Sequence, residues 1–286
     1  MEIGVQLAMN YWDNQKVVEG KEFVITTKID GERILAVKEN GSVRLFSRDG
    51  KKIEGLYDIE IDIKNIPFDF FILDGELTLL DKGNLPSKEQ YKETMKIARR
   101  KGEKHGLKML VFDYIPMLPS INIGRNYKYK SRRCFYNNFH YEFVEALPIL
   151  YQGYDVSMIE KLLEEQTSKG EEGIMINIAD APYVFNRTCN LLKVKKFKDA
   201  DLPIIGFEEG KGRNANKLGA LIVDYKGNKV KVGTGFTDEL REMFWKDKER
   251  WLGKTITVKY FEETPGGKSL RFPVYVDYRE DKWVNM

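Results

Sequence analysis

A lysine beside a predicted turn is the first group in this sequence that is placed to do chemistry. Lys28-Ile29-Asp30-Gly31 follows the β-branched run Phe23–Thr27, which predicts a strand, and Asp30-Gly31 predicts the turn that ends it. A lysine at a strand end is presented to a cleft, where cationic neighbours or desolvation favour the neutral, nucleophilic amine. Lys28 is therefore a candidate nucleophile, and its role depends on groups elsewhere in the chain.

Carboxylates occur beside two later apolar runs. Asp74-Gly75-Glu76 follows Phe70–Leu73, where we expect the end of a strand, and Glu172 directly precedes Gly173–Ile178. A carboxylate entering a buried strand suits Mg²⁺, which proteins usually hold with one or two carboxylates plus phosphates and water. Taken alone, each segment also fits a plain turn or an acidic loop.

Cations and an aromatic residue complete what a nucleotide phosphate would need. Lys193 and Lys195 are two residues apart on a predicted strand, so their ammonium groups share one face. Arg48 lies in a predicted turn, free to meet a phosphate, and Phe112 lies in an apolar strand, where its ring suits a purine. The competing interpretations are a solvated strand face for the lysines and ordinary core for Phe112.

Composition limits the class of protein. The chain has 286 residues, 42% of them hydrophobic and 32% charged, with a net charge of +3. Long apolar runs and a secretory signal are absent, so we expect no membrane segment. Two distant cysteines, Cys134 and Cys189, predict reduced thiols and a cytoplasmic protein. Only two histidines occur, which makes histidine-based metal chemistry a poor fit.

Strand patterns and helix patterns mix along the first two thirds of the chain. The predicted strands are Phe23–Thr27, Ile34–Lys38, Ser42–Phe46, Phe70–Leu73, Met109–Tyr114, Gly173–Ile178 and Leu191–Lys195. The predicted helices are Ser87–Lys101, 131–146 and 157–169.

The pattern changes near residue 200. Short alternating strands follow, with one helix among them; they are Leu202–Phe207, Ala220–Tyr225, Lys229–Gly233 and Thr255–Phe261, and the helix is Asp238–Arg250. This arrangement favours a small OB-fold barrel. We therefore expect two domains, 1–200 and 201–286, in an α+β protein.

The order of these motifs resembles the covalent nucleotidyltransferase superfamily of ATP-dependent DNA ligases, RNA ligases and mRNA capping enzymes. The matching segments are, in order, Lys28-Ile29-Asp30-Gly31, Ser47-Arg48-Asp49-Gly50, Asp74-Gly75-Glu76, the Phe112 strand, Glu172-Gly173 and Lys193-Val194-Lys195. Arg271-Phe272-Pro273, Gly233-Thr234-Gly235-Phe236 and the final Arg279-Glu280-Asp281-Lys282 look like those of DNA ligases of the minimal two-domain viral type. The resemblance implies a nucleotidyltransferase domain with ATP-grasp-like antiparallel sheets and helices, followed by the OB-fold.

The resemblance also implies a three-step reaction: Lys28 takes AMP from ATP, AMP passes to the 5′-phosphate of a nick, and the 3′-hydroxyl displaces it. The implied catalytic residues are Lys28, Asp30, Arg33, Lys193 and Lys195. The implied nucleotide-binding residues are Thr27, Lys28, Arg33, Arg48, Glu76, Phe112, Lys193, Lys195, Arg279, Asp281 and Lys282. Glu172 and Glu76 are the implied ligands of Mg²⁺ or Mn²⁺, and the final motif would close over the triphosphate.

The expected partner is nicked duplex DNA, bound by a monomer through the phosphate backbone. Three basic segments are candidates to line the duplex: Arg99–Lys101, Arg125–Arg133 and Lys211–Lys217. For each of them singly, an ordinary solvated surface is the better interpretation. An RNA ligase, an RNA-capping guanylyltransferase and a nick-binding protein without catalysis remain as alternatives.

Overall fold

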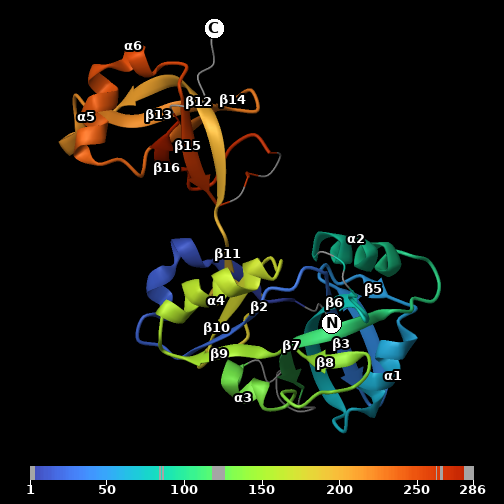
Figure 1. Cartoon of the computed structure of the whole chain (residues 1–286). Helices are drawn as coiled ribbons and strands as arrows, with labels where there is room; N and C mark the ends of the chain where they lie inside the picture. The colour runs from blue at the N-terminus through green and yellow to red at the C-terminus, as the bar shows by residue number, and fades with distance from the viewer. Residues whose placement is uncertain are drawn as a thin grey trace. The chain divides into compact units, whose positions relative to one another are not determined.

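The structure is a computed structural model, and it describes residues 4–83, 85, 87–117, 126–261, 263–264 and 267–279. Contacts along the chain divide it into two compact units, residues 1–195 and 196–286 (Figure 1). Each unit is described by itself. Among the described residues, no helix is long and apolar enough to span a membrane.

The first unit contains a five-stranded sheet, one strand of which ends directly before the predicted nucleophile Lys28. Its strand order is β1-β11-β10-β2-β9. The bounds are Leu7–Asn10 for β1, Arg187–Lys195 for β11, Gly173–Ile178 for β10, Phe23–Thr27 for β2 and Ile149–Gly153 for β9. Helix α4 (Ser157–Ser168) packs on this sheet, because residues at helical spacing on one side of it are apolar and buried.

A six-stranded sheet forms the other half of the first unit, in the order β5-β4-β3-β6-β7-β8. The bounds are Lys52–Ile53 for β5, Ser42–Ser47 for β4, Glu32–Glu39 for β3, Phe70–Leu79 for β6, Leu107–Pro116 for β7 and Val144–Ala146 for β8. Helices α1 (Tyr57–Asn65) and α2 (Ser87–Ala98) contact these strands (Figure 1). Apart from the parallel pairs β1–β11 and β7–β8, the strand pairs of both sheets are antiparallel.

Two predictions about these elements are wrong. Asp74-Gly75-Glu76 lies in the middle of β6, because Phe71, Leu73, Leu77 and Leu79 alternate onto one buried face and carry the strand onward. No single helix covers 131–146: helix α3 spans only Tyr129–Arg133, and β8 then pairs with β7. The chain turns between them because Tyr136 and Phe139 pack into the sheet's core.

The second unit is a closed five-stranded barrel, as the OB-fold prediction requires. Its sheet order is β14-β13-β12-β15-β16, and a bridge from Thr234, just after β14, to Val274 in β16 joins the two edges. The strand bounds are Lys198–Glu209 for β12, Leu218–Tyr225 for β13, Asn228–Val232 for β14, Thr255–Tyr260 for β15 and Val274–Tyr278 for β16. The expected helix 238–250 is two helices, α5 (Asp238–Lys246) and α6 (Lys248–Trp251), which cover the barrel core through Phe244 and Trp251.

Candidate active site

A cavity of about 340 Å³ in the first unit is lined by residues of both sheets. Eight residues that were predicted from the sequence line it: Thr27, Lys28, Arg33, Arg48, Glu76, Phe112, Lys193 and Lys195. They come from both sheets and from the turns beside them, so the two sheets together build this cavity. Its volume is of the size that binds a small organic ligand.

Lys28 lies at the end of β2, where the pairing of three strands fixes its neighbours. Its backbone N–H donates to the carbonyl of Gly173 at 2.9 Å, and Gly173 is in turn paired with Lys195 on β11. Glu172 precedes Gly173 and is therefore held between the two lysines. One carboxylate oxygen of Glu172 pairs with Lys28 Nζ, and the other pairs with Lys195 Nζ.

The charges of this trio compensate one another. Burial acts to raise the pKa of Glu172, but the neighbouring ammonium groups of Lys28 and Lys195 outweigh it and lower that pKa. The carboxylate therefore stays ionised and keeps both lysine side chains directed toward it. About a quarter of each of the three side chains is exposed, so a ligand can reach them.

Gly173 is required for this arrangement. Its φ is +153°, and a Cβ at this position would lie 2.1 Å from the carbonyl oxygen of Val194. Only glycine allows β10 to approach β11 so closely directly after Glu172. The close approach brings Glu172 beside Lys195.

Arg33 lines the cavity, but its guanidinium is bound within the fold. Its Nε and Nη2 donate to the two carboxylate oxygens of Asp74 at 2.9 and 2.5 Å, and Nη1 donates to the carbonyl of Gln6 at 2.7 Å. Asp74 is fully buried and also accepts a hydrogen bond from the Tyr183 hydroxyl at 2.5 Å. The guanidinium carbon lies 5.3 Å from the centre of the Phe112 ring, so Arg33 helps to build the cavity wall.

Glu76 lies on the cavity face of β6, two residues beyond Asp74. Desolvation raises the pKa of Glu76 to about 7, although the charges of Lys28 and Arg33 act to lower it. Its carboxyl group therefore exchanges its proton near neutral pH. In that range it can act as a hydrogen-bond donor or as an acceptor toward a hydroxyl group.

A Mg²⁺ ion fits this site only together with other oxygen ligands. Within the described part of the chain, no cluster of three or more His, Cys, Asp or Glu side chains is present that would hold a metal by itself. Glu172 is a partly exposed carboxylate paired with two cavity-lining lysines, Lys28 and Lys195, and offers the hard oxygen ligand that Mg²⁺ prefers. Phosphate oxygens of a bound nucleotide would supply the remaining coordination, with Glu76 as the second candidate carboxylate.

Five predicted site residues are not among those that line the cavity of the first unit. Glu172 contacts two lining residues, Lys28 and Lys195, without lining the cavity itself. Asp30 is exposed in the turn after Lys28 and does not line the cavity within the described region. Arg279 belongs to the second unit, where its backbone N–H donates to the Thr255 carbonyl at 3.0 Å. Asp281 and Lys282 lie outside the described residues.

The basic segment 125–133 differs from the prediction. Arg132 and Arg133 are buried, with only 1% and 5% of their surfaces exposed, so neither belongs to a solvated or DNA-facing surface. Arg132 pairs with the buried Asp113, and Arg125 lies outside the described residues. The segments Arg99–Lys101 and Lys211–Lys217 do present exposed basic side chains.

Sequence reasoning missed part of the cavity lining. These additional residues are Leu7, Ala8, Thr26, Ile29, Leu147, Met175, Asn177, Arg187 and Leu191. Met175 and Asn177 alternate along β10 beyond Glu172, so period-two alternation was a usable signal for them. Leu7 and Ala8 gave no such signal, because β1 has only four residues.

The sequence of each unit matches the model of a known domain family. The family model described as the ATP dependent DNA ligase domain matches residues 6–195, and that of the DNA ligase OB-like domain matches residues 209–279. The family assignment therefore covers both units independently of the site geometry.

Similar proteins carry the same family name. DNA ligase 2 of Methanosarcina mazei is 30% identical over 302 residues, which cover 92% of this chain and 52% of that protein. The DNA ligase of Thermococcus onnurineus is 31% identical, with coverages of 92% and 52%. The DNA ligase of Haemophilus influenzae is 28% identical over 271 residues, covering 94% of this chain and 90% of that protein. The chain thus spans about half the length of the relatives from Methanosarcina mazei and Thermococcus onnurineus.

Two solved structures are similar to this chain over nearly all of its length. The structure of Chlorella virus DNA ligase-adenylate is 26% identical with a TM-score of 0.51, covering 98% of this chain and all of that one. The structure named Pmar-Lig_Pre is also 26% identical, with a TM-score of 0.59, covering 98% of this chain and 68% of that one. The ATP dependent DNA ligase domain model matches two thirds of this chain, so the chain belongs to the ATP-dependent DNA ligase family.

Proposed function

We propose that this protein is an ATP-dependent DNA ligase that seals nicks between a 3′-hydroxyl and a 5′-phosphate in duplex DNA. The observation that supports this most directly is the placement of Lys28. Its amine lies at the edge of a nucleotide-sized cavity, paired with Glu172, and shares that carboxylate with Lys195.

In the first step, Lys28 Nζ attacks the α-phosphorus of ATP. A phosphorus–nitrogen bond forms, the bond from the α-phosphorus to the bridging oxygen breaks, and pyrophosphate leaves with those electrons. Lys28 must first lose a proton to solvent water, and the ionised carboxylate of Glu172 accepts a hydrogen bond from the amine and holds it in place. Lys193 and Lys195 line the same cavity and would stabilise the negative charge on the phosphates.

Mg²⁺ held by Glu172 and the nucleotide phosphates would neutralise charge on the phosphates and polarise the α-phosphorus. The remaining contacts belong to the chain. Phe112 presents its ring to the base, and Glu76 lies on the cavity face of β6, where it would bond a ribose hydroxyl.

In the second step, a 5′-phosphate oxygen of the nick attacks the phosphorus of lysyl-AMP, and the amine of Lys28 is released. In the third step, the 3′-hydroxyl oxygen attacks the 5′-phosphorus, the new phosphodiester bond forms and AMP leaves. Arg48 lies in the turn after β4 and lines the cavity, so it is the arginine best placed to bind the 5′-phosphate. Arg33 would support that site from within the wall, since Asp74 already holds its guanidinium.

The test is nick sealing with purified protein. We expect ATP, but not GTP, to support the joining of a DNA strand across a nick in a DNA duplex, and a duplex with a two-nucleotide gap serves as the control. Sealing confined to RNA strands would favour the RNA-ligase alternative. Transfer of GMP without any joining would favour the capping alternative.

A further inference from the structure

Phe112 occupies a β-bulge in β7. Across the β6–β7 pair, Asp74 is opposite Asp113 and Gly75 is opposite Val111, so Phe112 is the extra residue without a partner on β6. A bulge of this kind re-aims the side chain of the extra residue and interrupts the ladder of backbone hydrogen bonds. The Phe112 ring lines the cavity, whereas the flanking Val111 and Asp113 are buried.

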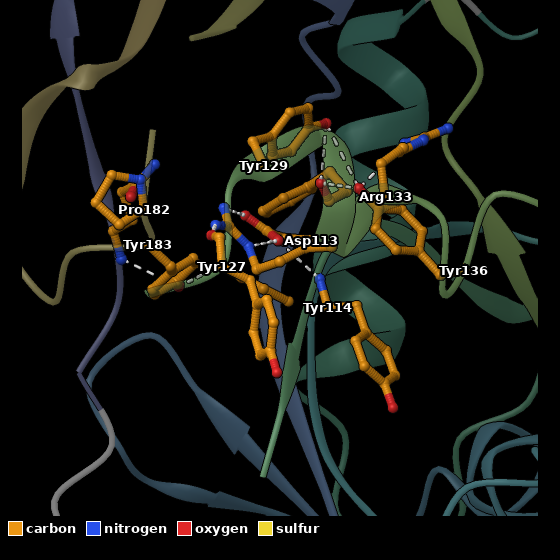
Figure 2. Close-up of polar contacts among 12 residues, drawn as sticks. Asp113, Tyr114, Tyr127, Tyr129, Arg133, Tyr136, Pro182 and Tyr183 are labelled. Atoms are coloured by element: carbon orange, nitrogen blue, oxygen red, sulfur yellow. Dashed lines mark hydrogen bonds and ion pairs between the residues drawn. The ribbon is translucent and has the colours of Figure 1, made fainter. Parts of the chain in front are cut away.

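Two tyrosine hydroxyls replace the missing ladder contact. The Tyr136 hydroxyl donates to the carbonyl of Phe112, and the Tyr129 hydroxyl lies 3.3 Å from the same oxygen. Both side chains are buried, with exposures of 0% and 1% (Figure 2). A partly buried carbonyl without a partner would be costly, so these hydroxyls stabilise the bulge.

Two buried arginines, Arg132 and Arg133, bind the groups around the bulge. Arg133 donates to the Tyr136 hydroxyl at 3.2 Å, and its guanidinium carbon lies 4.6 Å from the centre of the Tyr136 ring. Arg132 makes two hydrogen bonds of 2.8 Å to the carboxylate of Asp113, the residue after the bulge. Figure 2 shows Asp113, Tyr129, Arg133 and Tyr136 gathered around this part of β7. Arg132 and Arg133 thus stabilise the residues on either side of the bulge from their buried positions.

We propose that Tyr136, assisted by Tyr129, is a positioning residue for the nucleotide base. Its hydroxyl fixes the Phe112 carbonyl in the bulge, and the fixed backbone keeps the Phe112 ring against the base-binding part of the cavity. Tyr136 itself does not line the cavity, so it acts only through Phe112. This inference rests on the proposed function, because it takes the cavity to bind ATP.

The test compares two ligands that differ in having a base. Binding of α,β-methylene-ATP, which cannot transfer AMP, and of inorganic tripolyphosphate is measured by calorimetry for wild type and Tyr136→Phe. We expect Tyr136→Phe to weaken α,β-methylene-ATP about fivefold, the scale of a lost aromatic contact, and to leave tripolyphosphate unchanged. Equal weakening of both ligands, or no weakening of either, overturns the proposal.

Control variants keep the test decisive. Tyr141→Phe removes a hydroxyl from the same segment, where the Tyr141 ring packs beside Phe139, and should bind both ligands as wild type does. Tyr129→Phe removes the more distant donor and should weaken α,β-methylene-ATP about twofold, so it carries the test if Tyr136→Phe fails to fold. Wild type that binds no α,β-methylene-ATP would overturn the proposed function itself. If wild type, Tyr136→Phe and Tyr129→Phe all bind α,β-methylene-ATP equally tightly, only the role of the tyrosines is overturned.

Discussion

At the scale of single residues, the site depends on how charges are paired around Lys28. Glu172 accepts from both Lys28 and Lys195, and Asp74 pairs with the guanidinium of Arg33 in the cavity wall. Eight members of the cavity lining were predicted, some from strand ends and alternation, and Thr27 and Arg33 only from the family resemblance. The engagement of Arg33 with Asp74 was not predictable, since it depends on pairing between β3 and β6.

Replacing Glu172 with glutamine should slow the transfer of AMP to Lys28 by about a hundredfold or more, because the amide lacks the charged carboxylate that would hold both the Lys28 amine and the Mg²⁺ ion. Radiolabelled ATP in a single-turnover assay measures this rate. The neighbouring Glu171→Gln variant changes the same residue type one position away and should keep the wild-type rate. Equal rates for Glu172→Gln and wild type would contradict the role of Glu172.

The partly buried carboxyl group of Glu76 should make folding stability depend on pH. Desolvation raises the pKa of Glu76 from 4.5 to about 7, so the folded protein binds more protons than the unfolded chain between these values. The free energy of unfolding should therefore fall as pH rises through this window, by up to about 3 kcal/mol. Glu76→Gln should lack this part of the fall.

Urea unfolding at about pH 5 and about pH 8 gives the two free energies for each variant. The exposed Glu142→Gln serves as the control and should follow the wild-type pH dependence. A Glu76→Gln variant whose stability falls as much as that of wild type would show that Glu76 titrates at its ordinary pKa.

At the scale of elements, the site is created where strands approach one another closely. Strands β2 and β10 begin and end where the sequence predicts, because runs of buried β-branched and apolar residues have clear limits. The short helix α3, the continuation of β6 and the bulge at Phe112 were not predictable in the same way. Each is fixed by tertiary contacts, namely the burial of Tyr136, the pairing of β6 with β7, and two tyrosine hydroxyls.

Gly173→Ala tests the close approach of β10 and β11. The added Cβ would lie 2.1 Å from the Val194 carbonyl oxygen, so the strands must separate near Glu172. We expect a loss of stability of about 2 to 4 kcal/mol, from overpacking together with backbone strain, and a marked fall in AMP transfer.

Gly41→Ala provides the matched comparison for this glycine. Gly41 has a φ of +74° and no heavy atom within 4 Å of a built Cβ, so its replacement adds backbone strain without a clash. It should cost about 1 kcal/mol and leave AMP transfer unchanged. If chemical denaturation gives the two variants the same stability, the close approach at Gly173 is not a constraint.

At the scale of the whole molecule, each unit has its own hydrophobic core, and the family assignment covers both. The described core clusters of the first unit fall within residues 5–194, and that of the second unit within residues 200–278. The sequence predicts a change of pattern near residue 200 from the short alternating runs that follow it, and the two compact units divide at residue 195. The closure of the barrel through Thr234 and Val274 was not predictable, since one bridge between distant residues leaves no local signal.

Because the net charge is only +3, the proposed binding of nicked DNA should depend on local basic segments. The exposed side chains of Arg99–Lys101 and Lys211–Lys217 should contribute phosphate contacts. We expect the affinity for a nicked duplex to fall as salt rises, with a double-logarithmic slope of about −0.9 for each phosphate contacted. Replacing Lys211 and Arg213 together with glutamine should make this slope shallower in a fluorescence anisotropy titration. A slope that does not change would exclude the Lys211–Lys217 segment from the interface.

The central claim is that Lys28 carries AMP, and mass spectrometry of the intact protein tests it most directly. After incubation with ATP and Mg²⁺, we expect the mass to rise by one AMP group, and fragmentation to place that group on Lys28. Lys28→Arg, which keeps the positive charge but not the primary amine, should show no increase. An AMP group on another residue, or none on the wild-type protein with ATP, would contradict the account.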